Sequence, residues 1–430
     1  MTARELKRAG ALFLIAALAF LYPLLKGNAH FVGDITYSFQ PWLTYAAQEI
    51  QAGRFPLWNP YSACGELFVG NPQIMLFNPT AALFWIFPFT TANGLFLFLS
   101  QALLFFFTYL LARRWAGRRN PGQAHLHAPA ALAALAFAWG GFTVSQWEFP
   151  SAVGTLPFLP LLFLLGLGEF WVALSVGVAL AFTAGYVQFV HYGVFLAVAG
   201  AAHAAITRRP FHRWTARWSP LIWVGVALGA GILLSLAQIL PSWEMARQSF
   251  RAALSPAEAR HFSLAPIFLL KLWVPWITNT TALVFQQVPF GPEFWPIQRS
   301  WLSTLFLGTG VCLLSIVGIL RTPFRKTLTL GTVALAAGIL AFGVEPFFGW
   351  ARSLVPGFRY LTHFANASVL GLLCLTLWST EGAHQRRGRN ALLALVTLGL
   401  LGISLGLTFF TGIRALALRW LLGLATLNPA

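Results

Sequence analysis

Long apolar stretches alternate with short polar and basic segments along the whole chain. A bilayer core of about 30 Å needs roughly 20 apolar residues per helix, and lipid offers no partners to unpaired backbone groups. The pattern therefore predicts an all-α polytopic membrane protein with about eleven transmembrane helices, in which residues 1–430 form a single integral-membrane domain. The predicted spans are 9–26, 94–112, 128–147, 154–168, 170–186, 189–206, 219–240, 301–320, 327–343, 363–380 and 391–410.

Clusters of Lys and Arg between these spans predict the orientation. Because cytoplasmic loops are enriched in basic residues, we expect the N-terminus to lie in the cytoplasm. The segment 74–90 is interrupted by Pro79 and Pro88, so it is predicted to be a juxtamembrane or re-entrant piece. A cleavable signal peptide over 1–29 is the alternative for the first span and leaves the remaining topology unchanged. The basic loops are 113–119, 208–217, 321–326 and 384–389.

Composition supports the membrane assignment. The chain is 58% hydrophobic and 9% charged, with a mean hydropathy of +0.70, whereas soluble domains carry about 25% charged residues. The net charge of +17 is divided among short loops. Basic residues in short loops set the orientation of membrane spans, so this distribution argues against nucleic-acid binding. The three cysteines are scattered, without the spacing of a metal site or a disulfide framework.

Two long segments, 27–93 and 241–300, are predicted to lie outside the cytoplasm and to carry most of the acidic residues. The basic loops on the other side contain no GxxxxGK[ST] phosphate-binding loop. Chemistry is therefore expected on the outer face. Because nucleotides are not supplied there, an activated donor would arrive already attached to a membrane lipid.

The only aspartate of the chain, Asp34, follows the first predicted span. A carboxylate at this position would act as general base toward a hydroxyl, or as a ligand of a hard divalent cation. The alternative is a turn residue that hydrogen-bonds its own loop. Glu148, in "SQWEFPS" at the outer end of the third span, is a second candidate for the same site.

The first outer segment also combines aromatic, proline and amide side chains in "GRFPLWNPY". Aromatic faces stack on sugar rings while amides bind hydroxyls, although an interfacial aromatic belt gives the same mixture. Near the outer end of a later span, Gln188 follows Gly185 in a polar break. The predicted substrate-binding residues are Trp58, Asn59, Tyr61, Asn71, Gln73, Glu148 and Gln188.

Basic side chains recur in two further outer segments. Glu244, Arg247 and Arg251 are spaced i, i+3, i+7, so a helix would present them on one face. Arg359 and His363 are spaced i, i+4 at the mouth of the tenth predicted span. Guanidinium groups suit phosphate geometry, so these four cations are predicted to bind the phosphate of a donor. An interfacial helix and snorkelling side chains are the alternatives.

Five stretches occur in a recognisable order: "GDITYSFQPW" continuing through "AGRFPLWNPYSACGELFVGNPQ", "GFTVSQWEFPSAVGTLPFLPLLFL", "AGYVQFVHY", "LAQILPSWEMARQSFR" and "VPGFRYLTHFANASVLGL". Together they resemble the YfhO-type family of bacterial membrane proteins, within the GT-C superfamily of glycosyltransferases. The similarity covers about 30–372. In the last stretch an expected Arg-x-Pro reads Arg359-Tyr360-Leu361. Many family members also continue beyond the equivalent of residue 410, which leaves open a missing acceptor-binding domain.

The resemblance implies a multi-span enzyme that uses polyprenyl-phosphate-linked sugars. In relatives a catalytic acidic residue lies in the first extracytoplasmic loop, the place that Asp34 occupies here. That residue acts as general base on the acceptor, or helps to hold a divalent metal in oligosaccharyltransferases. No Asp-x-Asp motif is present. Two alternatives therefore remain for the cofactor: none, or a divalent metal such as Mg²⁺ or Mn²⁺.

The resulting hypothesis is an inverting sugar transfer in the bacterial cytoplasmic (inner) membrane. The donor is a polyprenyl-phosphate-linked sugar, and the acceptor is a hydroxyl of an envelope glycan or glycolipid, with Asp34 as general base. The alternatives are a lipid-linked oligosaccharide flippase or transporter, and a catalytically inactive scaffold of the cell envelope.

Overall fold

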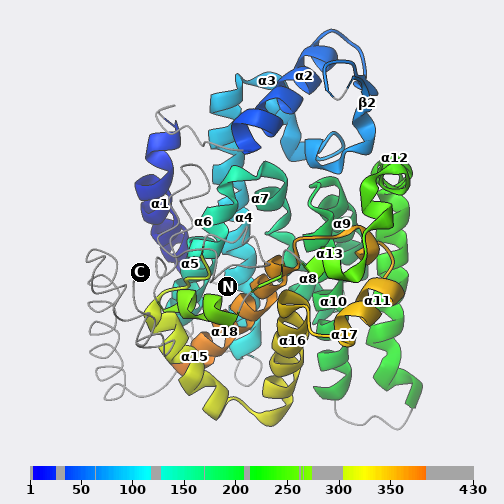
Figure 1. The fold of residues 1–430 in the computed structure, drawn as a ribbon. Helices are drawn as coiled ribbons and strands as arrows, with labels where there is room; N and C mark the ends of the chain where they lie inside the picture. Colours follow the sequence, from blue (N-terminus) through cyan, green and yellow to red (C-terminus); the bar gives the residue numbers. More distant parts are fainter. Residues whose placement is uncertain are drawn as a thin grey trace, which may run out of the picture.

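The structure is a computed structural model that describes residues 3–25, 34–62, 64–117, 127–168, 170–207, 214–260, 263–264, 266–273 and 304–383. Within these ranges the protein is all-α apart from one two-stranded hairpin, β1 (Trp58–Asn59) with β2 (Glu66–Leu67). Figure 1 shows long helices packed side by side and, at the top, a smaller layer built from residues 34–86, here called the cap.

The helices of the bundle follow the apolar stretches of the sequence. They are α1 (Ala3–Leu25), α4 (Phe89–Gly117), α5 (His127–Ala138), α6 (Gly141–Ser145), α7 (Pro150–Thr155), α8 (Phe158–Gly166), α9 (Trp171–Thr183), α10 (Val187–Thr207), α11 (Trp214–Leu234), α15 (Thr309–Arg321), α16 (Phe324–Phe342) and α18 (Ser368–Ala383).

Shorter elements build the cap and the connections. The cap contains a π-helical turn η1 (Ile35–Phe39), α2 (Gln40–Gln51), the hairpin, three 3₁₀ turns and α3 (Ala82–Ile86). The 3₁₀ turns are η2 (Phe68–Gly70), η3 (Pro72–Ile74) and η4 (Pro79–Ala81). The connections contain η6 (Gln146–Glu148), α12 (Leu236–Gln248), η7 (Phe250–Ala253), α13 (Pro256–Ala259), η9 (Pro266–Leu272), α17 (Phe347–Leu354), η11 (Phe358–Tyr360) and η12 (Phe364–Ala367).

Several helices are long and apolar enough to cross a membrane. In the described ranges these are Phe89–Gly117, His127–Glu148, Val187–Thr207 and Phe324–Phe342. The predicted span 219–240 is not one straight helix, because α11 and α12 meet at an angle of 77°. The all-α membrane character is therefore confirmed, whereas the number of eleven spans stays a prediction, and span 391–410 lies outside the described residues.

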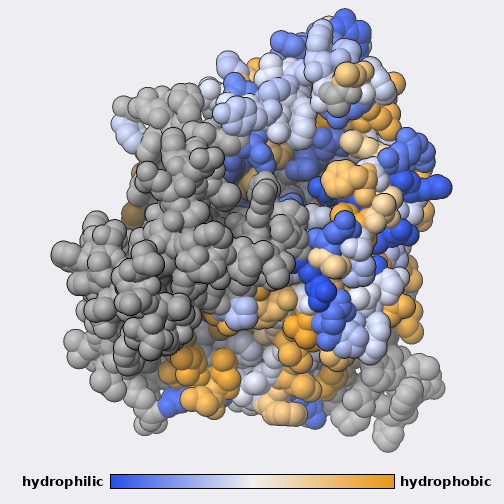
Figure 2. Space-filling view, in the orientation of Figure 1, coloured by the Kyte–Doolittle hydropathy of each residue, from blue (hydrophilic) through white to orange (hydrophobic). Residues whose placement is uncertain are grey.

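Residues 74–88 contain only short helical turns, the longest being the five residues of α3. This agrees with the expectation that Pro79 and Pro88 prevent a crossing, since proline interrupts helices. The cap is also the more polar part of the visible surface. Figure 2 shows mainly hydrophilic residues over the top of the molecule, and hydrophobic residues are commoner below it.

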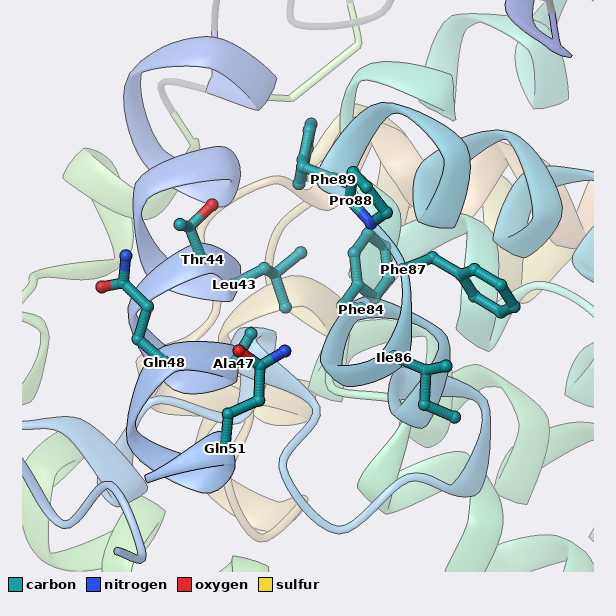
Figure 3. Close-up of a pocket in the computed structure, with 10 residues that line it drawn as sticks. All are labelled: Leu43, Thr44, Ala47, Gln48, Gln51, Phe84, Ile86, Phe87, Pro88 and Phe89. Atoms are coloured by element: carbon teal, nitrogen blue, oxygen red, sulfur yellow. The ribbon is translucent and has the colours of Figure 1, made fainter. Parts of the chain in front are cut away.

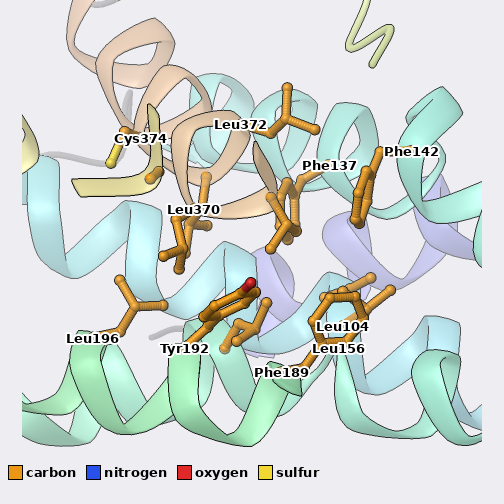
Figure 4. Close-up of a cluster of buried hydrophobic side chains, with 14 of the residues drawn as sticks. Leu104, Phe137, Phe142, Leu156, Phe189, Tyr192, Leu196, Leu370, Leu372 and Cys374 are labelled. Carbon is orange, nitrogen blue, oxygen red and sulfur yellow. The ribbon is translucent and has the colours of Figure 1, made fainter. Parts of the chain in front are cut away.

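The core lies where α4, α5, α10 and α18 pack against one another. Phe137, Phe189 and Tyr192 have 1% or less of their surface exposed, and Figure 4 shows them among leucines from the surrounding helices. The Tyr192 hydroxyl accepts a hydrogen bond of 2.7 Å from Gln188 Nε2. The core is thereby joined to the polar residues at the start of α10.

Helices α15 and α18 approach each other backbone to backbone. A Cβ placed on Gly318 would lie 1.9 Å from the Trp378 carbonyl oxygen, and one on Gly382 would lie 2.1 Å from that of Leu314. On the same pair of helices Ser315 Oγ donates to the Leu375 carbonyl oxygen at 2.7 Å. Small residues and a crossing hydrogen bond are typical of helix pairs that associate in lipid.

Substitution Gly318→Ala is therefore expected to destabilise the protein by roughly 1–3 kcal/mol, the usual cost of overpacking. Thermal unfolding of the purified protein in detergent measures the effect. The matched control is Gly371→Ala in α18, where nothing lies within 4 Å of the added Cβ. Equal unfolding temperatures for the two variants would contradict the close contact.

Candidate functional site

Asp34 and Glu148 meet where the cap joins the bundle. The main-chain N–H of Asp34 donates a hydrogen bond of 3.0 Å to Glu148 Oε1, and both residues are half-buried. Asp34 immediately precedes the π-helical turn η1, whereas Glu148 ends η6, the turn that follows α6. The structure thus brings Glu148 next to Asp34, the residue with which it was expected to share a site.

The environment of the Asp34 carboxylate is unlike that of an ordinary turn residue. Although Asp34 is the N-cap of η1, its side chain makes no capping hydrogen bond. Among the described residues no cation lies within ion-pair distance of Asp34 or Glu148. Burial raises the pKa of Asp34 above its ordinary value of 3.8. A raised pKa makes a carboxylate a stronger base toward a hydroxyl.

A second group of residues, here called the basic cluster, surrounds Arg251. The positive charge of Arg251 acts on both His363 and the Tyr186 hydroxyl, which places the three residues in one region of the molecule. The side chain of Gln188 donates to the His363 carbonyl oxygen at 2.8 Å, and that of Asn366 donates to the Tyr186 hydroxyl at 2.8 Å. Burial lowers the pKa of Arg251, and Tyr186 opposes part of the shift.

Helix α7 lies between the carboxylates and the basic cluster. It begins at Pro150, two residues after Glu148. At its other end the Thr155 hydroxyl accepts a 3.2 Å hydrogen bond from the main-chain N–H of Tyr186. Near its start, Ser151 Oγ lies 3.4 Å from Gln73 Oε1 of the cap. One short helix therefore contacts three parts of the chain that carry candidate residues.

Two local predictions about the cations were wrong. Arg251 does not share a helical face with Glu244 and Arg247, because α12 ends at Gln248 and Ser249 is extended, with φ −84° and ψ 159°. Arg359 and His363 do not lie on one helix either, since Leu361 is extended between η11 and η12. In both cases an extended residue turns the chain where the spacing argument assumed a continuous helix.

The remaining cations differ in position. Arg359 Nη2 donates to the Ala252 carbonyl oxygen at 2.8 Å, so this side chain lies next to the turn that carries Arg251. Arg247 is exposed in the last turn of α12.

The predicted sugar-binding residues divide into two groups. Asn71 and Gln73 lie on the turn at η3, where the Asn71 side chain accepts from the Gln73 main-chain N–H at 3.1 Å, close to α7. Trp58, Asn59 and Tyr61 lie at the hairpin instead. There Asn59 is buried and accepts from the Tyr61 N–H, while the other two side chains are 54% and 85% exposed. The hairpin group thus offers aromatic faces to solvent.

The cavity drawn in Figure 3 lies elsewhere, between α2 and the turn that precedes α4. Its volume is about 370 Å³, and its walls are apolar with the amides of Gln48 and Gln51 at one side. None of the candidate residues lines it. It is therefore separate from the candidate site.

The carboxylates are the residues that could hold a metal. Mg²⁺ commonly takes one or two carboxylates together with water and substrate phosphates, so Asp34 and Glu148 would be its protein ligands here. Among the described residues no group of three or more His, Cys, Asp or Glu side chains is arranged to bind a metal. The metal requirement stays a prediction.

Sequence reasoning missed Tyr186 and Asn366. Tyr186 stands beside Gly185, whose φ of +96° and close approach to Pro72 explain the polar break that was noticed. Asn366 has no comparable signal, because its partner lies 180 residues away.

Comparison of the chain with protein-family models, with curated proteins and with solved structures finds no match. The resemblance to YfhO-type proteins accordingly stays a prediction that rests on the quoted motifs.

The raised pKa of Asp34 predicts a pH-dependent difference in stability. The folded protein holds the proton more tightly than the unfolded chain, so this contribution is present below about pH 3.8 and is lost as pH rises through the folded pKa. Asp34→Asn is therefore expected to raise the unfolding temperature at pH 7, with the gain disappearing toward pH 4. Thermal unfolding between pH 4 and 8 measures it.

The control is Glu49→Gln. Glu49 is a cap carboxylate whose pKa is lowered by the hydrogen bond from Arg54. This variant should not gain stability at pH 7. A wild-type protein as stable as Asp34→Asn at every pH would contradict the burial of the carboxylate.

Proposed function

We propose that the protein transfers a sugar from a polyprenyl phosphate to a hydroxyl of an acceptor outside the cytoplasm. The observation that carries the proposal is the hydrogen bond between Asp34 and Glu148 near the start of α7. Near the other end of α7, Thr155 contacts Tyr186, on which the charge of Arg251 acts. A base for the acceptor and a positive charge for the leaving phosphate are the two requirements of such a reaction.

In the proposed step the acceptor hydroxyl attacks the anomeric carbon. Asp34 takes the hydroxyl proton while the new carbon–oxygen bond forms. The bond from the anomeric carbon to the phosphate oxygen breaks, and the lipid phosphate leaves with the electron pair. A single displacement inverts the anomeric centre, so the product has the configuration opposite to that of the donor.

Each side chain has a separate task in this proposal. Glu148 accepts a hydrogen bond from the Asp34 main-chain N–H and so fixes the position of the base. Arg251 stabilises the charge that grows on the phosphate. His363 is uncharged at neutral pH, because burial lowers its pKa to about 4, and it acts as a hydrogen-bond donor to the phosphate. Gln73 approaches α7 from the cap and would contact the sugar in this proposal.

A lipid-linked oligosaccharide flippase is the second candidate. The 77° bend between α11 and α12 favours it, because interrupted helices form the substrate sites of many transporters. Such a protein would move the intact lipid and leave the sugar–phosphate bond unbroken.

Asp34→Asn is expected to lower sugar transfer roughly 10²–10⁴-fold, the usual contribution of a general base. Glu148→Gln should cause a smaller loss, because it alters the position of the base but retains Asp34. The measurement uses purified protein in proteoliposomes with a panel of radiolabelled polyprenyl-phosphate hexoses and pentoses.

Glu49→Gln is the matched control and should transfer sugar at the wild-type rate, since its carboxylate pairs with Arg54 on the cap. Transfer that survives Asp34→Asn would remove the proposed base. Movement of intact labelled lipid across the bilayer without release of the sugar would favour the flippase instead.

A further inference from the structure

Arg352 is a buried arginine whose partners are main-chain carbonyl groups. It lies in the last turn of α17 and is 6% exposed. Its Nη1 donates to the Leu361 carbonyl oxygen at 3.2 Å, and its Nη2 donates to those of Leu254 at 3.1 Å and Arg359 at 2.9 Å. One guanidinium thus joins three chain segments.

Two of these segments lead directly to the basic cluster. Leu254 follows η7, the turn that carries Arg251, and Leu361 stands two residues before His363. A second guanidinium makes a parallel connection, since Arg359 Nη2 donates to the Ala252 carbonyl oxygen at 2.8 Å. The turn at 250–254 is therefore held against 359–361 at two points.

The charge balance of this region is unusual. Burial lowers the pKa of Arg352, and the neighbouring positive charge of Arg359 lowers it further. In the described part of the chain neither side chain forms an ion pair with a carboxylate. Arg251, Arg352 and Arg359 bring three positive charges close to the same two turns. Such a grouping is unfavourable, because like charges repel and a buried charge loses its hydration. An anion bound nearby would offset that cost.

We propose that Arg352 is a positioning residue for an anion-binding site, holding Arg251 and His363 together so that both reach one phosphate group. The inference rests on the phosphate-binding role proposed above for those two residues. It adds Arg352 as the residue that sets the distance between Arg251 and His363. Lysine keeps the charge but presents a single ammonium group, which cannot reproduce the planar donor geometry that bridges three carbonyl groups.

The test is a double-mutant cycle on binding of farnesyl phosphate by the purified protein in detergent, with farnesol and inorganic phosphate as comparison probes. Arg352→Lys and Arg251→Gln are each expected to weaken farnesyl phosphate binding by about tenfold to a hundredfold. The double variant should bind little worse than Arg251→Gln alone, because Arg352 acts through Arg251. Farnesol binding should not change.

Arg325→Gln is the matched control, since this exposed arginine also donates to a carbonyl group, that of Ile206 at 3.3 Å, and lies outside the site. Wild-type affinity in Arg352→Lys, or losses that multiply in the double variant, would overturn the positioning role. If inorganic phosphate binds as tightly as farnesyl phosphate, the anion is a free phosphate and not a lipid headgroup, and the positioning role is judged from the same cycle with that probe.

Hydrogen exchange of the wild-type protein covers the case in which the Arg352 variants fail to fold. Farnesyl phosphate should protect 250–254 and 359–363 together, and protection of one segment alone would overturn the inference. Binding is measured without sugar transfer, so a protein that binds through Arg352 but transfers nothing would contradict only the proposed function. Absence of any anion binding by the wild type would overturn both.

Discussion

The hydrogen bond from the Asp34 main-chain N–H to the Glu148 carboxylate joins the cap to the helix bundle across 114 residues of sequence. It stands at the start of the cap, so it fixes where η1 and α2 leave the bundle. It also uses one oxygen of Glu148 and leaves the Asp34 carboxylate without a capping role in η1. The one aspartate of the chain is thus held through its backbone, and its side chain would be available for the proposed proton transfer.

Three arginines, Arg251, Arg352 and Arg359, are grouped around the turn at 250–254, and their partners are mainly neutral. Arg352 and Arg359 donate to carbonyl oxygens, and the charge of Arg251 acts on the Tyr186 hydroxyl. Neutral acceptors satisfy the N–H groups of a guanidinium but do not cancel its charge. The region therefore keeps a positive potential that attracts anions, whereas a network of ion pairs would have removed it.

The apolar pattern predicted the helical membrane architecture because burial in lipid demands long hydrophobic helices, as in α4 and α10. The apolar pattern also placed Asp34 and Glu148 at the ends of predicted spans. Two residues at the same end of the helix bundle can come into contact, as these two do. Side-chain spacing failed for the cations, since the argument assumed a continuous helix through Ser249 and Leu361. Backbone torsions at those two residues depend on tertiary contacts. Asn366 was missed because its hydrogen-bond partner, Tyr186, lies 180 residues away in the sequence.

The length of α7 links the two halves of the candidate site. It has six residues, so at 1.5 Å per residue it is about 9 Å long. In-line displacement requires the incoming hydroxyl and the departing phosphate on opposite sides of the anomeric carbon. In the proposed reaction, the carboxylates near the start of α7 would supply the base and Arg251 would stabilise the leaving group. Because the residues of α7 are almost all buried, the donor of the proposed reaction would approach the ends of the helix, with its phosphate toward Arg251 and its anomeric carbon toward Asp34. The same polarity disfavours the reverse orientation, because it would place the phosphate against two carboxylates.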